Sequence, residues 1–159
     1  MNIDIIAVGK IKERYLREGL KEYEKRLKPY CRLRILETLE EKVPESLSSL
    51  EQKQVLSREG QLMLDRLHPH TFIIALCLEG RQFSSEEMAQ KLSDLAVYGN
   101  SHLTFLIGGS LGLSGEVKQK ADLLLSFSHF TFPHQLMRLI LLEQIYRWFK
   151  IIRGESYHK

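Results

Sequence analysis

Three segments of this 159-residue chain offer backbone and side chains suited to binding a nucleotide-like ligand. The first is a glycine-rich loop, Gly108-Gly109-Ser110-Leu111-Gly112. Three glycines in five residues let the backbone turn sharply and approach a ligand without a Cβ in the way. The spacing matches neither the dinucleotide-binding G-x-G-x-x-G pattern nor a P-loop, so no phosphate cradle is expected. A plain tight turn is the alternative interpretation.

The second segment, residues 126–135, reads SFSHFTFPHQ and combines hydroxyl groups with aromatic rings. Two serines, a threonine and three phenylalanines supply hydrogen-bonding groups together with flat apolar surface. This mixture suits a purine with its ribose better than a triphosphate. The alternative is a structured turn before the last helix with its phenylalanines in the core, and such loops often do both.

The third segment is the C-terminal tail, which ends in Tyr157-His158-Lys159. A tyrosine can stack on a base, a histidine can exchange a proton near neutral pH, and a lysine can contact phosphate. Chain ends are usually disordered, which is the alternative here. The spacing of these residues by itself does not establish a role.

The elements that must position these segments follow from hydrophobic periodicity and from breakers. Apolar runs predict strands, and helical spacing with capping signals predicts helices between them. The strands are expected at 2–8, 32–39, 71–78, 102–107 and 123–126, and the helices at 12–27, 48–67, 84–98, a short stretch from 114, and 135–152. This alternation predicts one α/β domain with a mainly parallel sheet. Ligands of such sheets bind outside the carboxyl ends of the strands, which here are the loops after residues 78, 107 and 126.

The last predicted helix, 135–152, is apolar around most of its circumference. Such a helix is either packed on all sides by its own domain or forms part of a subunit interface. In a chain this short we favour the interface, with polar groups such as Arg138 and Arg147 interrupting it.

The net charge is only +3, but positive charge gathers near the N-terminus. Between Lys10 and Arg34 there are ten Lys or Arg against four Glu. This clustering suits a polyanionic partner, although a solvated helix face is the simpler interpretation. No membrane span, signal peptide or metal site is expected. Cys31 and Cys77 are interpreted as buried thiols in a reducing compartment. A cytoplasmic protein is therefore expected.

Several motifs resemble one known family. The stretches FLIGGSLGL (Phe105 to Leu113), LSFSHFTFPHQLMRLILLEQIYRWFKI (Leu125 to Ile151) and the terminal YHK are similar to the RlmH family of ribosomal large-subunit pseudouridine methyltransferases. The N-terminal IDIIAVGKIKERYLREGLKEYEKRLKPY also resembles that family, so the similarity spans the chain. The family belongs to the SPOUT class of knotted methyltransferases.

The resemblance implies a single domain over residues 1–159, with a deep trefoil knot in a cofactor-binding part at about 71–159. It also implies a homodimer that transfers a methyl group from S-adenosylmethionine to N3 of a pseudouridine in 23S rRNA, free or in the ribosome. The residues that would hold the cofactor are Leu76, Gly108, Phe127, Ser128, His129, Phe130, Thr131 and Phe132.

For catalysis the resemblance places Tyr157 and His158 at the active site, and we expect Arg138 or Lys159 to supply a nearby cation. RNA contacts are expected from the basic residues Lys10, Lys12, Arg14, Arg17 and Lys159.

The sequence departs from the family pattern at two places. Ser110-Leu111 stands where the family usually has Pro-Glu, and Ser156 and Lys159 replace a proline and an arginine. The lysine keeps the charge but loses bidentate phosphate geometry. Two alternatives stay open: a non-catalytic nucleotide- or ribosome-binding homologue, and a methyltransferase that acts on tRNA.

Overall fold

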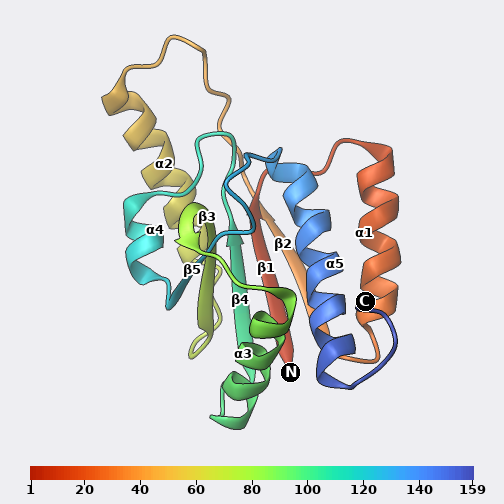
Figure 1. The fold of residues 1–159 in the computed structure, drawn as a ribbon. Helices are drawn as coiled ribbons and strands as arrows, with labels where there is room; N and C mark the ends of the chain where they lie inside the picture. Colours follow the sequence, from red (N-terminus) through yellow and green to blue (C-terminus); the bar gives the residue numbers. More distant parts are fainter.

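Five strands form one sheet in the computed structural model, which describes residues 1–159 (Figure 1). The strands are β1 (Asn2–Val8), β2 (Arg32–Thr38), β3 (Phe72–Arg81), β4 (His102–Ile107) and β5 (Leu123–Leu125). Their order across the sheet is β2-β1-β4-β3-β5, and all four pairings are parallel. Every strand therefore ends at the same edge of the sheet, and the loops that follow the strands gather there.

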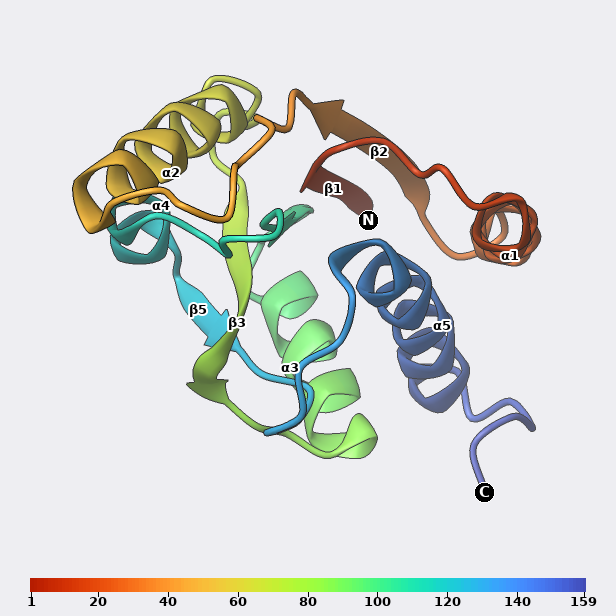
Figure 2. The same ribbon diagram turned by 90° about the horizontal axis from the view of Figure 1, so that it is seen from above.

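Helices cover both faces of this sheet. They are α1 (Arg14–Leu27), α2 (Ser49–Leu64), α3 (Ser85–Val97), α4 (Gly115–Lys120) and α5 (His134–Ile152). Helices α1, α3 and α5 lie on one face and α2 and α4 on the other (Figures 1 and 2). The predicted α/β class with helices on both faces is confirmed, and the sheet is parallel throughout.

The alternation of side chains along the central strands produces two hydrophobic cores. Ile3 and Ile5 of β1 pack with α1, α3 and α5, whereas Ile6 and Val8 pack with α2 and α4. Because both faces are covered, β4 is buried along its whole length. This burial explains why its sequence, HLTFLI, is almost continuously apolar.

Local capping signals fix where two helices begin. Ser48 and Glu51 form a capping box at α2, and Ser84 and Glu87 form one at α3. In each box the serine hydroxyl accepts the backbone N–H of the glutamate, and the glutamate carboxylate accepts the N–H of the serine. The predicted start of the helix at Ser84 is therefore correct to one residue.

Strand β3 differs from its prediction because it continues to Arg81 instead of ending at Leu78. Leu125 of β5 lies opposite both Leu76 and Arg81, so residues 77–80 form a large bulge outside the ladder. Gly80 permits this arrangement, since a Cβ there would lie only 2.6 Å from the backbone of Leu125. The bulge ends beside the loop that follows β5, where the Ser126 N–H donates to the Arg81 carbonyl at 3.0 Å.

Helix α5 lies between α1 and α3 and buries one side against the sheet (Figure 2). Trp148 is 1 % exposed and stacks on Phe105 of β4 at 6.1 Å between ring centroids. Other apolar side chains of α5, including Leu136 and Ile140, remain half-buried. Despite its apolar character α5 does not qualify as a membrane-spanning segment, and neither does any other helix.

Candidate functional site

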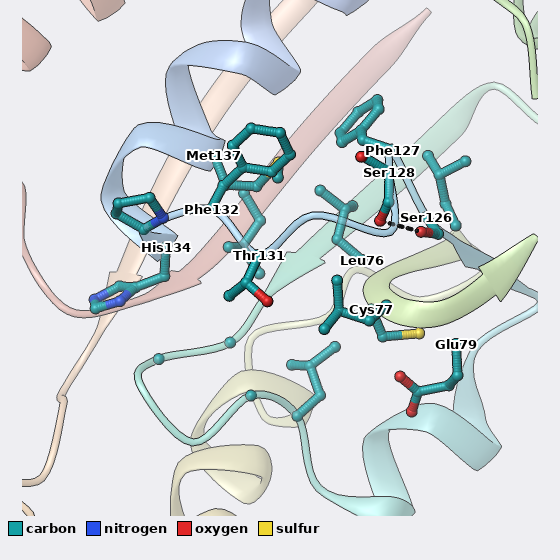
Figure 3. Close-up of a pocket in the computed structure, with 18 of the residues that line it drawn as sticks. Leu76, Cys77, Glu79, Ser126, Phe127, Ser128, Thr131, Phe132, His134 and Met137 are labelled. Carbon is teal, nitrogen blue, oxygen red and sulfur yellow. Dashed lines mark hydrogen bonds between the residues drawn. The ribbon is translucent and has the colours of Figure 1, made fainter. Parts of the chain in front are cut away.

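A pocket of about 740 Å³ opens at the edge of the sheet where the strands end (Figure 3). It is formed by the bulge of β3, the glycine loop after β4, the Ser/Phe loop after β5, and the first turn of α5. Its lining comprises residues 76–79, 107–113, 125–128 and 130–134, together with Lys118 and Met137. The three loops singled out from the sequence thus meet around one space.

Seven of the eight residues expected to hold a cofactor line this pocket. They are Leu76, Gly108, Phe127, Ser128, Phe130, Thr131 and Phe132. His129 does not line it and is exposed to solvent. The family resemblance implied that every residue from 127 to 132 holds the cofactor. In the structure the side chain of His129 is exposed to solvent and is not part of the lining.

The glycine loop forms a tight turn on one side of the pocket. The Gly112 N–H donates to the Gly109 carbonyl at 3.0 Å. Gly112 has φ +83°, and a Cβ on Gly108 would overlap the backbone carbonyl of Gly112. Both positions therefore require glycine, one for its backbone conformation and the other for close packing.

The Ser/Phe loop is held by its own hydroxyl groups. The Ser126 hydroxyl donates to the Ser128 carbonyl at 3.1 Å, and the Ser128 hydroxyl accepts the Phe130 N–H at 3.0 Å. Phe127 stacks on Trp148 beneath the loop, whereas Phe130 is 78 % exposed at the pocket. Figure 3 shows Thr131 of this loop opposite Cys77 of β3.

The charged groups of the pocket lie at the bulge of β3. Lys118 of α4 donates a hydrogen bond to the carboxylate of Glu79, and this contact is the main cause that lowers the pKa of Glu79. Glu79 is the only carboxylate in the lining. Burial raises the pKa of the neighbouring Cys77, which is therefore a neutral thiol. Cys77 is half-buried in the pocket wall, whereas Cys31 is buried as expected.

Arg138 lies outside the pocket lining and inside the protein. Its side chain is 1 % exposed, donates to Glu37 at 2.7 Å, and donates to the Gly9 carbonyl at 2.9 Å. Burial lowers the pKa of the guanidinium, and Glu37 opposes that effect. The cation thus ties α5 to the ends of β1 and β2, a role that helical periodicity could not reveal.

The tail folds back along α5 and contacts α3. The Tyr157 hydroxyl donates to Glu143 at 3.0 Å, and burial is the main cause that raises the pKa of this phenol. His158 Nε2 lies 2.6 Å from the Glu86 carboxylate, and its Nδ1 lies 3.3 Å from the Arg147 guanidinium. Tyr157 and His158 are therefore brought together with partners that do not line the pocket.

The start of the tail is fixed as well. Glu155 accepts hydrogen bonds from Tyr30 and Lys150, each at 2.5 Å. These two hydrogen bonds lower the pKa of Glu155, and the one from Lys150 is the larger cause. The tail of this fold is consequently an ordered segment docked on α5.

Two of the residues expected to contact RNA lie at the same edge of the sheet as the pocket. Lys10 and Lys12 are exposed between β1 and α1. The Lys12 N–H donates to the Gln135 side chain at 3.2 Å. Gln135 follows His134, which lines the pocket and lies 3.4 Å from the Glu40 carboxylate.

The other expected RNA contacts are spread over the surface. Arg14 and Arg17 are exposed at the start of α1, and Arg14 pairs with Glu18 at 2.8 Å. Lys159 is exposed at the end of the tail. An exposed ion pair of this kind is weak and leaves Arg14 available to another anion.

The sequence analysis did not identify several lining residues, among them Cys77, Glu79, Lys118 and Met137. The strand was predicted to continue regularly to Leu78, so only the loop after it, and not the bulge at 77–80, was expected at the site. A glycine directly after a strand-like run, here Gly80, was the signal that could have indicated a bulge. Nothing in the sequence indicated that Lys118 of a short helix would reach the same place.

Comparisons with known proteins agree with this geometry. Residues 1–158 match a family model described as "Predicted SPOUT methyltransferase". The chain is 60% identical to the Ribosomal RNA large subunit methyltransferase H of Carboxydothermus hydrogenoformans and 56% identical to that of Clostridioides difficile, over 100% of each chain. A solved structure of a probable methylase family protein from Haemophilus influenzae is similar in fold, with a TM-score of 0.56 at 12% identity over 99% of this chain and 70% of the other.

Proposed function

This chain belongs to the SPOUT methyltransferase family, and we propose that it transfers a methyl group from S-adenosylmethionine to N3 of a pseudouridine in 23S rRNA. The observation that carries the proposal is the single pocket formed where three loops meet at the ends of parallel strands. The names of relatives at 53% to 60% identity over full length support ribosomal RNA of the large subunit as the substrate class.

The residues of the pocket fit an adenosyl donor. A volume of about 740 Å³ lies in the range of small-molecule sites, and half of the lining residues are hydrophobic. The glycine loop leaves its backbone open to an adenine edge, and the hydroxyls of Ser128 and Thr131 add hydrogen-bonding groups. Since Lys118 is paired with Glu79, the pocket offers no uncompensated lysine or arginine to repel a sulfonium. When bound, the donor would supply the methyl group from a positively charged sulfonium, whose sulfur leaves as a neutral thioether.

The work left to this chain is to position the nucleotide and to manage one proton. The imide N3–H must lose its proton before or during attack, and His158 is the proposed acceptor or orienting group. A cation beside the ring would favour the imide anion. Lys159 is exposed and can approach RNA, whereas Arg138 is enclosed by Glu37 and the Gly9 carbonyl.

We further propose that the active form is a homodimer in which the tail of one subunit serves the pocket of the other. The partners of Tyr157 and His158 do not line the pocket of their own chain. Half-buried apolar side chains of α5 such as Leu136 and Ile140 offer surface for a second copy. The deep trefoil knot in 71–159 and a cytoplasmic site of action belong to this proposal too, the latter because ribosomal RNA is the substrate.

The basic residues near the pocket are the proposed RNA contacts. Lys10 and Lys12 lie beside the first turn of α5, and Arg14 and Arg17 continue the positive surface along α1. Such contacts bind phosphate without reading sequence. Selection of one nucleotide would then depend on the shape of the RNA around it.

The experiment is transfer of labelled methyl from S-adenosylmethionine to ribosomes, to free large-subunit rRNA and to tRNA, in parallel. We expect label in large-subunit rRNA, and the comparison of ribosomes with free rRNA identifies the form that is methylated. Label confined to tRNA would favour the tRNA methyltransferase. No label in any RNA would favour the non-catalytic homologue.

A further inference from the structure

The bulge of β3 places one carboxylate in the wall of the pocket. Residues 77–80 leave the ladder between Leu76 and Arg81, and Gly80 packs against the backbone of Leu124 and Leu125 too closely for any Cβ. Bulges next to sites commonly redirect a side chain. Here the bulge brings Glu79 to the pocket, where a regular strand would carry its side chains above and below the sheet.

A second contact holds this carboxylate in an ionised and oriented state. Lys118 donates a hydrogen bond to Oε1 of Glu79, and the Cys77 thiol and the Glu79 backbone lie beside the same carboxylate and also lower its pKa. The side chain of Glu79 is 54% exposed and lines the pocket, so part of it is accessible to a ligand there. Figure 3 shows the carboxylate beside Cys77, at the end of the pocket away from His134.

We propose that Glu79 accepts hydrogen bonds from the ribose hydroxyls of the adenosyl donor, and that Lys118 presets the carboxylate for this contact. This inference rests on the proposed function, because it assigns a partner within the same pocket. A carboxylate is the acceptor that a vicinal diol prefers, as in dinucleotide-binding sites that hold a ribose through Asp or Glu. Glu79 is the only carboxylate in the lining, so it is the one side chain of the pocket that can offer an ionised carboxylate as acceptor.

The sulfonium is the competing partner for a carboxylate in this place. The two can be separated by the choice of ligand, because S-adenosylhomocysteine keeps the ribose and lacks the positive charge. Its 2′-deoxy and 3′-deoxy analogues lack one hydroxyl each. Calorimetric titration of the full-length protein with these compounds measures binding without any methyl transfer.

We expect Glu79→Gln to weaken S-adenosylhomocysteine binding roughly ten- to hundredfold, since a neutral amide replaces the charged acceptor. At least one deoxy analogue should bind the wild type more weakly than the parent compound, and Glu79→Gln should remove most of that difference. Glu116→Gln is the matched control, because Glu116 is an exposed carboxylate outside the pocket lining, in the first turn of α4. It should bind like the wild type.

Three results would overturn the inference. Unchanged affinity of Glu79→Gln for S-adenosylhomocysteine would show that the carboxylate does not contact the ribose. Loss confined to S-adenosylmethionine would assign Glu79 to the sulfonium. An equal loss for the parent and both deoxy analogues would mean that Glu79 only supports the bulge. If the wild type bound none of these ligands, the proposed function itself would fail, which is a separate outcome.

Discussion

Gly108 is the residue at which the glycine loop tolerates least change. A side chain there would overlap the Gly112 carbonyl, whereas a Cβ on Gly115 would meet nothing within 4 Å. We predict that Gly108→Ala weakens S-adenosylhomocysteine binding at least tenfold, because the loop must shift to admit the methyl group. Gly115→Ala is the control and should bind normally. Calorimetry on both variants gives the comparison, and equal affinities would remove the loop from the pocket's function.

In the proposed mechanism His158 acts in proton transfer and takes no part in cofactor binding. Its ring contacts Glu86 and Arg147 and no residue of its own pocket. We predict that His158→Ala lowers the methylation rate about a hundredfold or more, as expected for loss of a general base, with little change in affinity for the cofactor. Single-turnover rates and calorimetry test the two halves separately. An unchanged rate would exclude His158 from proton transfer.

Asp4 is a buried carboxylate whose contribution to stability depends on pH. Burial raises its pKa, but hydrogen bonds with Arg34 and His102 outweigh burial, so the pKa falls below its ordinary value of 3.8. The contribution is complete above that value and is lost as the pH falls through the lowered folded-state pKa. Asp4→Asn should cost about 1–3 kcal/mol at neutral pH. On acidification below pH 3.8, the urea midpoint of Asp4→Asn should also change less than that of the wild type. Equal changes of the two midpoints with pH would contradict a stabilising role of the ionised Asp4.

At the scale of elements, hydrophobic periodicity predicted the sheet and its helices well because both faces of the sheet are covered. Both ends of the strand at 102–107 were predicted correctly, because a short, nearly continuous apolar run is typical of a parallel strand buried on both faces. The end of β3 was predicted wrongly because a bulge interrupts the pattern at residues 77–80. The burial of Arg138 could not be predicted, because it depends on Glu37, which is distant in sequence.

The loop before α1 and the first turns of that helix form the surface on which RNA binding is expected to depend. Lys10, Lys12, Arg14 and Arg17 are all exposed there. We predict that rRNA affinity falls steeply with salt. Each replacement of one of these residues by alanine should make the negative slope of log K against log salt shallower by roughly 0.7–0.9. Lys53→Ala is the control, because Lys53 is an exposed lysine of α2, and it should leave the slope unchanged. Filter binding over a salt series measures it, and slopes insensitive to all four replacements would place the RNA elsewhere.

For the whole molecule, the arrangement of pocket and tail predicts how two damaged subunits combine. A His158→Ala subunit keeps its pocket, and a Gly108→Ala subunit keeps its tail. In a mixed dimer, the intact tail can serve the intact pocket only if tails act across the interface. We predict that mixing the two impaired variants under conditions that exchange subunits restores up to one working site per mixed dimer.

The same mixing experiment has a clear negative result. If each tail served its own pocket, every subunit in the mixture would carry one defect and no activity would return. Mass measurement in solution gives the accompanying control, because complementation requires that the protein is a dimer under the assay conditions. A monomer with full activity would contradict the shared site.

The central claim is that this pocket supports methylation of pseudouridine in the RNA of the large ribosomal subunit. The most direct measurement is to incubate the protein with labelled S-adenosylmethionine and unmethylated ribosomes, digest the RNA to nucleosides, and identify the labelled product by mass spectrometry. We predict a single labelled product, 3-methylpseudouridine from 23S rRNA, whose yield falls with Gly108→Ala at cofactor concentrations that do not saturate the variant. Label on any other nucleoside, or no label in ribosomal RNA, would contradict the account.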